Sequence, residues 1–185
     1  RLNTILNSAD ACIYIKDTQL RYTYCNRTMY ERYHCDSSQL LGATDRDFLP
    51  SQIAHNIRLA DLRVIQLGER VVSEEEIPRD DGAGLETYLS IKIPLRSANG
   101  TITSLCGIST NITELRQSQA AIQRLAYYDA LTDLPNRRML QEHMEQAQSA
   151  QKSTGIIAGL LFIDLDKFKN INDERGHEVG DAVLR

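Results

Sequence analysis

Apolar and alternating apolar–polar stretches recur through residues 1–113 and predict five short β-strands. The strands are expected at Ala11–Lys16, Arg21–Cys25, Val71–Ile77, Leu85–Leu95 and Ile102–Ile112. Turn residues separate neighbouring strands at Asp17–Gln19, Asp80–Gly82 and Ala98–Gly100. Because the last three strands are joined by tight turns, they form an antiparallel meander. The pattern therefore predicts a five-stranded antiparallel sheet with helices on one face.

Two helices are predicted between the second and third strands. Asn26 suits an N-cap and begins a helix that runs to His34. A longer helix follows Pro50, with Ser51 as its cap, because apolar residues recur every three to four positions as far as Leu67. Gly68 then provides the stop.

A further helix is predicted over residues 113–128. Leu115, Ser118, Ile122 and Leu125 lie at the a and d spacing of a heptad repeat, flanked by Gln and Arg. Two interpretations remain open from this pattern. Two copies of the chain pair along the seam, or the helix is a linker that lies on its own domain.

Composition narrows the classes of function. The chain has 185 residues, a net charge of -4 and 42% hydrophobic residues, which favours a globular protein over a disordered one and gives no support for nucleic-acid binding. The longest apolar run, residues 156–163, is far shorter than the roughly 20 residues that a membrane helix needs. The cysteines are too widely spaced for a zinc site and are expected to be free thiols; they are Cys12, Cys25, Cys35 and Cys106. Since the chain begins at Arg1, it is expected to be a fragment, and an upstream membrane anchor stays open.

The order of elements in residues 1–113, two strands, short helices and three long strands, resembles the PAS sensory domain. The residues that carry the resemblance are Ile15–Asp17, Tyr24–Arg27, Leu41–Gly42 and Gly107–Thr113. The last stretch is similar to the D-x-T signature that ends such domains, with Asn111 in the position of the Asp. The resemblance implies an α+β fold and a ligand between the sheet and the long helix. His55 on that helix is the candidate ligand-binding residue, while haem and flavin are disfavoured and the ligand is left open.

The C-terminal residues carry the groups suited to chemistry. A helix is expected over Arg138–Ala150, then an apolar strand over Gly159–Ile163 that ends in Asp164 and Asp166, and a second helix opened by Gly176–Asp181. Carboxylates at the exit of a buried strand suit Mg²⁺. Lys169 adds positive charge for a phosphate, and Asn172 and Asp181 are polar groups that suit a base edge. On spacing alone, a solvated strand-to-helix connection remains an equal interpretation.

Two motifs in this region look like the start of a GGDEF domain, the diguanylate cyclase family. They are D-A-L-T-D-L-P-N-R-R at 129–138 and F-I-D-L-D-K-F-K-N-I-N-D-E-R-G-H-E-V-G-D at 162–181. By this resemblance, Asp164 and the Leu165 carbonyl bind Mg²⁺ or Mn²⁺. Phe168 and Lys169 lie along the GTP phosphates, and Asn172 and Asp181 contact the guanine.

The two resemblances imply a domain order of PAS domain (1–113), linker helix (114–128) and an incomplete α/β GGDEF segment (129–185). The expected function is the sensory and dimerising region of a bacterial cyclic di-GMP signalling protein. The intact parent would be a cytoplasmic diguanylate cyclase that joins two GTP molecules and works as a homodimer. Because the GGDEF loop lies outside these residues, this chain alone is expected to be inactive.

Two alternatives remain. The parent could use its GGDEF domain only to bind GTP and regulate an attached cyclic di-GMP phosphodiesterase, or the PAS domain could be a dimerisation module without a ligand.

Overall fold

The computed structural model describes residues 1–79, 81–155 and 159–185, and the chain divides into two compact units, Arg1–Arg116 and Gln117–Arg185. Asp80, which belongs to one of the predicted turns, lies outside the described residues, as do residues 156–158. Each unit is described by itself.

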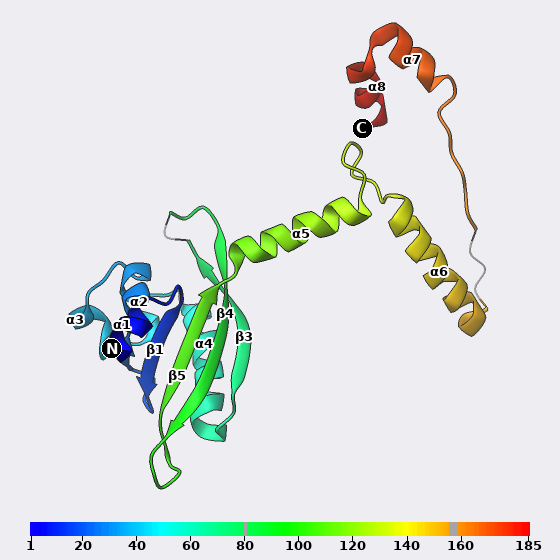
Figure 1. Cartoon of the computed structure of the whole chain (residues 1–185). Coiled ribbons are helices and arrows are strands. Elements are labelled where there is room, and N and C mark those ends of the chain that lie inside the picture. The colour runs from blue at the N-terminus through cyan, green and yellow to red at the C-terminus, as the bar shows by residue number, and fades with distance from the viewer. Residues whose placement is uncertain (80, 156–158) are drawn as a thin grey trace. The chain divides into compact units, whose positions relative to one another are not determined.

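The first unit contains a five-stranded antiparallel sheet, as the sequence predicts. Its strands lie in the order β2-β1-β5-β4-β3 (Figure 1). The strand bounds are β1 Cys12–Asp17, β2 Tyr22–Cys25, β3 Val71–Pro78, β4 Leu85–Arg96 and β5 Ile102–Asn111. All five predicted strands are therefore confirmed, with ends that differ by one residue. Because β5 pairs with both β1 and β4, the first and last strands of the unit meet at the centre of the sheet.

Helices fill the chain between β2 and β3, and a short helix precedes β1. Figure 1 shows α4 behind β3, β4 and β5. The bounds are α1 Leu2–Asn7, α2 Arg27–Arg32, α3 Ser37–Leu40, the 3₁₀ turn η1 Asp45–Asp47, α4 Ser51–Leu62 and the π-helical turn η2 Arg63–Leu67. The helix α1 was not predicted, because six residues are too few to show a helical period.

Local chemistry explains where these helices begin and end. The Asn26 side chain accepts a hydrogen bond from Met29 N at 3.2 Å and caps α2, as predicted. The prediction that Ser51 caps α4 is wrong by one residue, since Pro50 holds the N-cap position and Ser51 is the first helical residue. Proline has no backbone N–H, and the N–H groups at the start of a helix have no partner within the helix. Proline at this position therefore costs no helical hydrogen bond. Gly68 ends the helix with φ of 69°, a left-handed conformation that favours glycine.

The core of this unit lies between the inner face of the sheet and the helices. Twelve buried side chains form one hydrophobic cluster: Cys12, Tyr14, Leu20, Tyr22, Cys25, Met29, Leu40, Val64, Val71, Ile77, Tyr88 and Leu105. Tyr14 and Tyr22 pack edge to face, with ring centroids 5.6 Å apart. The ring of Tyr14 crosses Gly107 so closely that any Cβ at Gly107 would collide with it.

The strand β4, which lies between β5 and the edge strand β3, has an inverted pattern of polarity. Ser90 and Lys92 point to the inner face and are fully buried. Leu89, Ile91 and Ile93 alternate with them and point to the outer face, away from α4, where they are half-buried or exposed. An antiparallel sheet with one wet face usually shows the opposite arrangement. Both faces of β4 therefore depart from the ordinary division into apolar core and polar surface.

The second unit is helical in its described part. The helix α5 (Thr113–Tyr127) leads out of the first unit, and α6 (Arg137–Thr154), α7 (Phe168–Arg175) and α8 (His177–Leu184) follow. Asn136 caps α6 by accepting from Arg138 N and Met139 N, so this helix begins one residue earlier than predicted. Among the described residues, no helix is long and apolar enough to cross a membrane.

The predicted strand Gly159–Ile163 is wrong for this structure. Residues 159–165 have no regular secondary structure, and Leu161, Phe162 and Ile163 are about four-fifths exposed. A strand is stable only when its backbone groups pair with a neighbour. The described part of the second unit contains no other strand of comparable length with which this segment could pair.

Candidate functional site

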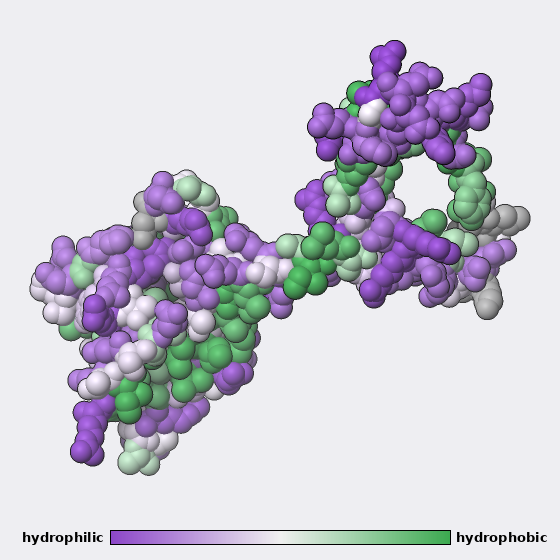
Figure 2. All heavy atoms as spheres, turned by 45° about the horizontal axis from the view of Figure 1, so that its top comes forward, coloured by the Kyte–Doolittle hydropathy of each residue, from purple (hydrophilic) through white to green (hydrophobic). Residues whose placement is uncertain are grey.

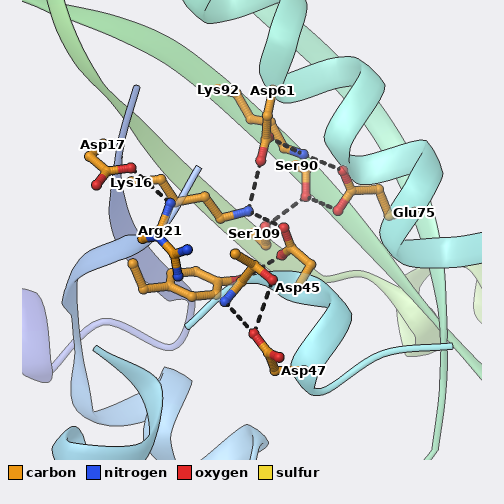
Figure 3. A network of polar contacts seen from close by, with 12 residues as sticks. Lys16, Asp17, Arg21, Asp45, Asp47, Asp61, Glu75, Ser90, Lys92 and Ser109 are labelled. Atoms are coloured by element: carbon orange, nitrogen blue, oxygen red, sulfur yellow. Dashed lines mark hydrogen bonds and ion pairs between the residues drawn. The ribbon is translucent and has the colours of Figure 1, made fainter. Parts of the chain in front are cut away.

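A network of charged side chains lies inside the first unit, between the sheet and α4 (Figure 3). Lys16 from β1 lies at its centre and is fully buried. Its Nζ donates to Asp45 Oδ2 at 2.6 Å and to Asp61 Oδ2 at 2.7 Å. Since Asp45 belongs to η1 and Asp61 to α4, this one lysine connects the sheet to both helical elements.

A second buried lysine extends the network to the edge of the sheet. Lys92 Nζ from β4 lies 2.9 Å from Asp61 Oδ1 and 2.8 Å from Glu75 Oε1 on β3. Both contacts are short ion pairs between buried groups, so Coulomb attraction contributes strongly to them. Asp61 thus bridges the two lysines. Its side chain has no exposed surface.

Hydroxyl groups satisfy the remaining carboxylate oxygens. Tyr22 donates to Asp45 Oδ1 at 2.7 Å, and Ser90 donates to Glu75 Oε2 at 2.8 Å. The Ser90 and Ser109 hydroxyls are 2.6 Å apart. Six elements of the first unit, all five strands and α4, therefore meet in one polar cluster together with η1.

The network holds two cations and three carboxylates, so it carries one uncompensated negative charge when all five are ionised. Burial by itself lowers the pKa of Lys92, but Tyr14, Asp61 and Glu75 around it raise that pKa above its ordinary range. Burial also raises the pKa of Tyr14 and of Tyr22 well above the usual phenol value. Lys92 is thus held charged, and both tyrosines neutral, at physiological pH.

Two hollows adjoin this network, and Glu75 and Ile57 line both. An interior cavity of about 30 Å³ is lined by Cys12, Tyr14, Tyr22, Met29, Arg32, Tyr33, Asp45, Ile57, Glu75, Ile77, Tyr88 and Ser109. A wider groove of about 790 Å³ lies beside α4 and β3 and includes Arg116 at the start of α5. His55 lines neither hollow and is exposed on α4. The structure does not bring it toward the interior.

The first turn of α5 is fastened to the sheet. Thr113 Oγ1 accepts a hydrogen bond from Thr87 N at 2.9 Å, and Asn111 Oδ1 accepts from Thr113 N at 3.0 Å. Arg116 pairs with Glu74 on β3. The Asn111 side chain therefore caps the start of α5. The contacts with β3 and β4 fix the direction in which α5 begins.

In the second unit, the residues expected at a metal lie in the extended segment before α7. Asp164, Leu165 and Asp166 are exposed. Lys167 has φ of 58° and turns the chain into α7, so Phe168 and Lys169 form the first turn of that helix. Within the described ranges, no three His, Cys, Asp or Glu side chains gather to hold a metal ion.

The residues expected at the guanine lie where α7 meets α8. Asn172 Oδ1 is buried there without a hydrogen-bond partner among the described residues. Its side chain lies against Gly180, where any Cβ would collide with Asn172 Oδ1. Asp181 follows Gly180 and is exposed. The structure therefore brings Asn172 close to the residue next to Asp181, and it leaves Asp164 apart in the extended segment.

Comparison with known proteins agrees with this architecture. Residues 6–117 match the family described as the PAS fold. The chain belongs to the PAS family. Residues 126–185 match the family described as diguanylate cyclase, GGDEF domain, so a GGDEF segment follows the PAS domain.

Three individual proteins illustrate the likeness. A diguanylate cyclase of Vibrio cholerae is 32% identical over 181 residues, which cover 97% of this chain and 56% of that protein. The cyclic di-GMP phosphodiesterase PdeR of Escherichia coli is 27% identical over 182 residues, covering 98% of this chain and 27% of that protein. A PAS domain from Colwellia psychrerythraea shares the fold, with a TM-score of 0.51 at 18% identity over 60% of this chain and 93% of that one. The chain thus spans about half the length of the first relative and about a quarter of the second.

The lysine network of the PAS domain was missed by the reasoning from sequence. One signal for it was present, because Asp61 occupies the apolar side of the predicted helix, four residues after Ile57 and three before Val64. A carboxylate at such a position needs a buried cation. Lys16 and Lys92, both inside apolar strands, were the available partners.

Proposed function

We propose that this chain is the sensory and dimerising region of a cyclic di-GMP signalling protein whose intact GGDEF domain joins two GTP molecules. The supporting observation is the order of parts, a PAS domain joined through the single helix α5 to a GGDEF segment. The sequence likeness to the Vibrio cholerae diguanylate cyclase extends over 97% of this chain and so includes both parts. The proposal includes a cytoplasmic location, because GTP is a cytoplasmic substrate.

The guanine base is proposed to bind at Asn172 and Asp181. A buried amide oxygen without a partner is costly, so Asn172 Oδ1 calls for a donor from a ligand or from another part of the protein. The guanine edge carries N–H donors, and the exposed carboxylate of Asp181 accepts from the same kind of edge. An adenine presents a different donor pattern. The pair therefore explains selection of GTP.

The phosphates and the metal ion are proposed to lie at the segment before α7 and at the first turn of that helix. Asp164 and the Leu165 carbonyl offer two oxygen ligands, the donor type that Mg²⁺ and Mn²⁺ prefer, and phosphate oxygens would supply more. When bound, the ion neutralises phosphate charge during attack of a 3′-hydroxyl on an α-phosphate. Lys169 adds a positive charge beside the phosphates, and Phe168 anchors the turn.

Two GTP molecules require two GGDEF domains, so we propose a homodimer. Leu115, Ile122 and Leu125 on α5 are 55%, 67% and 73% exposed, and their spacing of seven and three residues places them on one side of the helix. A second copy of α5 would cover these three side chains.

The test uses the intact parent protein with its complete GGDEF domain, incubated with GTP and Mg²⁺, and measures cyclic di-GMP by chromatography. Asp164→Ala is expected to abolish product formation. Asp181→Ala is expected to raise KM for GTP at least about tenfold, because one charged hydrogen bond is lost. The matched control is Asp173→Ala, an exposed aspartate on α7 with no proposed role.

Two results would count against the proposal, and a third would identify a folding defect. Degradation of cyclic di-GMP without synthesis would favour a GTP-binding regulator of a phosphodiesterase. An unchanged KM in Asp181→Ala would remove the guanine assignment. Equal losses in Asp173→Ala and Asp181→Ala would point to a folding defect, which circular dichroism of both variants would reveal.

A further inference from the structure

Strand β3 forms one edge of the PAS sheet, with β4 on one side and α4 behind it (Figure 1). Thr87 on β4 turns its N–H to Thr113 Oγ1 and its carbonyl to Ile112 N, on the side away from β3. The pair Thr87–Glu76 therefore exchanges no hydrogen bonds, and the backbone N–H and C=O of Glu76 point away from β4. Every second residue of β3 has the same orientation, because the pattern of an antiparallel pair alternates.

The free side of β3 offers a short row of backbone groups. Val72, Glu74 and Glu76 turn their N–H and C=O groups outward, and no described residue bonds to them. The row ends at Pro78, which has no N–H and whose carbonyl accepts from Arg32 Nη2 at 2.8 Å. Unpaired backbone groups on an edge strand are a template on which a further strand can add.

The groove of about 790 Å³ follows this edge of the sheet. Its wall on α4 is largely apolar and consists of Ile53, Asn56, Ile57 and Ala60. Along β3 the groove is acidic, with Glu74, Glu75 and Glu76 in succession, and Arg116 is the basic residue among those that line it. Side chains alternate along a strand, so Glu74 and Glu76 lie on the outer side of the sheet and Glu75 on the inner side.

Charge distinguishes this edge from the face of the sheet. Figure 2 shows hydrophobic side chains gathered in one broad area of the first unit, with hydrophilic side chains around it. Glu75 already pairs with Lys92, and Glu74 pairs with Arg116. Glu76 is exposed, and no described residue forms an ion pair with it. The edge therefore keeps a negative charge that attracts a cationic partner.

The alternation along β3 selects the kind of segment that can add. In an antiparallel pair, residues directly opposite each other place their side chains on the same face. Residues opposite Glu74 and Glu76 would lie on the outer side, where Lys or Arg forms a favourable pair. The alternate residues would face Ile53 and Ile57 on α4, where apolar side chains suit the wall. A second copy of β3 is unsuited, because glutamates would then face glutamates.

We propose that the free edge of β3 binds an extended segment of a partner protein, in which basic and apolar residues alternate, as a sixth and antiparallel strand. The outward backbone groups of Val72, Glu74 and Glu76 hold this strand, and the two outer glutamates pair with its basic side chains. Arg116 pairs with Glu74 and lines the same groove, so the incoming cation competes with Arg116 for that carboxylate. Occupation of the edge therefore loosens the base of α5.

The test uses the 185-residue chain and a blocked peptide of alternating lysine and valine with eight residues, the length of β3. Isothermal titration calorimetry measures the dissociation constant, and amide exchange followed by NMR locates the peptide. Binding is expected to slow exchange at the amides of Val72, Glu74 and Glu76. Methylation of the lysine backbone nitrogens, which face β3 in the antiparallel register, is expected to raise the dissociation constant at least about tenfold. Methylation of the valine nitrogens, which face away from β3, should change it little.

Variants of the chain test the role of charge. Glu76→Lys is expected to raise the dissociation constant about tenfold, because like charges then lie opposite each other. Arg116→Gln is expected to lower it about threefold, because the competing cation is removed. Glu31→Lys is the matched control, since it makes the same change of charge at an exposed glutamate on α2 outside the groove. It should leave the dissociation constant unchanged, and circular dichroism verifies the fold of each variant.

A peptide of the same composition, with all lysines before all valines, separates strand addition from attraction to an acidic surface. Equal affinity for this peptide and for the alternating one would overturn the proposal, as would an affinity that methylation of the lysine nitrogens leaves unchanged. Absence of binding to the alternating peptide at about 1 mM would also overturn it. Binding at β3 needs neither GTP nor a second copy of the chain. A failure here therefore leaves the proposed cyclase activity standing, and an inactive parent leaves the β3 site standing.

Discussion

The carboxylate of Asp61 is the point at which the buried network of the PAS domain is most easily broken. It lies 2.7 Å from Lys16 Nζ and 2.9 Å from Lys92 Nζ, and all three side chains have no exposed surface. Asp61→Ala removes the group that the two ammonium ions share. Lys16 then keeps Asp45, and Lys92 keeps Glu75.

Removal of one partner from a buried ion pair destabilises a protein by about 3–5 kcal/mol, because a desolvated charge is left behind. The remaining carboxylates bring the loss toward the lower end of this range. A domain of this size loses roughly 4 °C of Tm per kcal/mol, so a decrease of about 12 °C or more is expected. Such a loss is a large part of the total stability of about 5–15 kcal/mol that domains possess.

Urea unfolding followed by tyrosine fluorescence measures this loss in the PAS domain, because all tyrosines except Tyr127 and Tyr128 belong to residues 1–116 and the chain has no tryptophan. Glu31→Ala is the matched control. Glu31 also pairs with a cation at 2.6 Å, but that pair with Arg27 is 59% and 73% exposed. An exposed pair of this kind contributes at most about 0.5 kcal/mol.

Similar losses of stability in Asp61→Ala and Glu31→Ala would contradict this prediction. The buried ion pairs of Asp61 would then contribute no more free energy than the exposed pair of Glu31 with Arg27. Asp61→Asn provides a second measurement if the alanine variant does not fold. It keeps the shape and one acceptor, so it should lose less than Asp61→Ala and clearly more than Glu31→Ala.

Three further predictions concern the same domain. Asn111→Ala should cost about 1 kcal/mol in urea unfolding through the lost cap of α5, while Asn111→Asp should stay within about 0.5 kcal/mol of wild type. Gly107→Ala should cost about 1–3 kcal/mol, because its Cβ meets the Tyr14 ring; a neutral result would contradict the close packing. Burial raises the pKa of Cys12 to about 11 and of Cys25 to about 12, so neither thiol should react with Ellman's reagent at pH 8 before unfolding. Since the unfolded thiol loses its proton near pH 9 and the folded one does not, stability should fall as pH rises from about 9 to 12, and less steeply in Cys25→Ala.

The sheet and the main helices of the PAS domain follow from patterns that act over a few residues. Alternation placed the strands within one residue, and Asn26 and Gly68 marked a helix start and a helix end. These local patterns did not predict which face of each strand points to the core. On β4 the buried Lys92 pairs with Asp61 and Glu75, which are distant in sequence, so the strand alone does not reveal its orientation.

In the GGDEF segment, the sequence motifs identified the family but did not predict the local structure. Its motifs identified the family, yet the predicted strand Gly159–Ile163 is absent, because strand pairing depends on a neighbouring strand and not on the apolar run itself. Asn172 and Asp181 were named from the motif. Their arrangement depends on Gly180, whose missing side chain makes room for Asn172 where α7 and α8 meet. No local pattern encodes that contact.

Because the base of α5 is attached to the sheet, a small movement of the sheet produces a larger movement at the far end of the helix. Thr113 and Arg116 hold the base of the helix against β4 and β3, and the helix has 15 residues. It therefore measures about 22 Å from base to tip. A tilt of about 10° at the base would carry the tip by about 4 Å, enough to change which side chains meet along a paired helix. A shift in the β3–β4 pair too small to alter the core would be amplified along this lever before it reached the GGDEF segment.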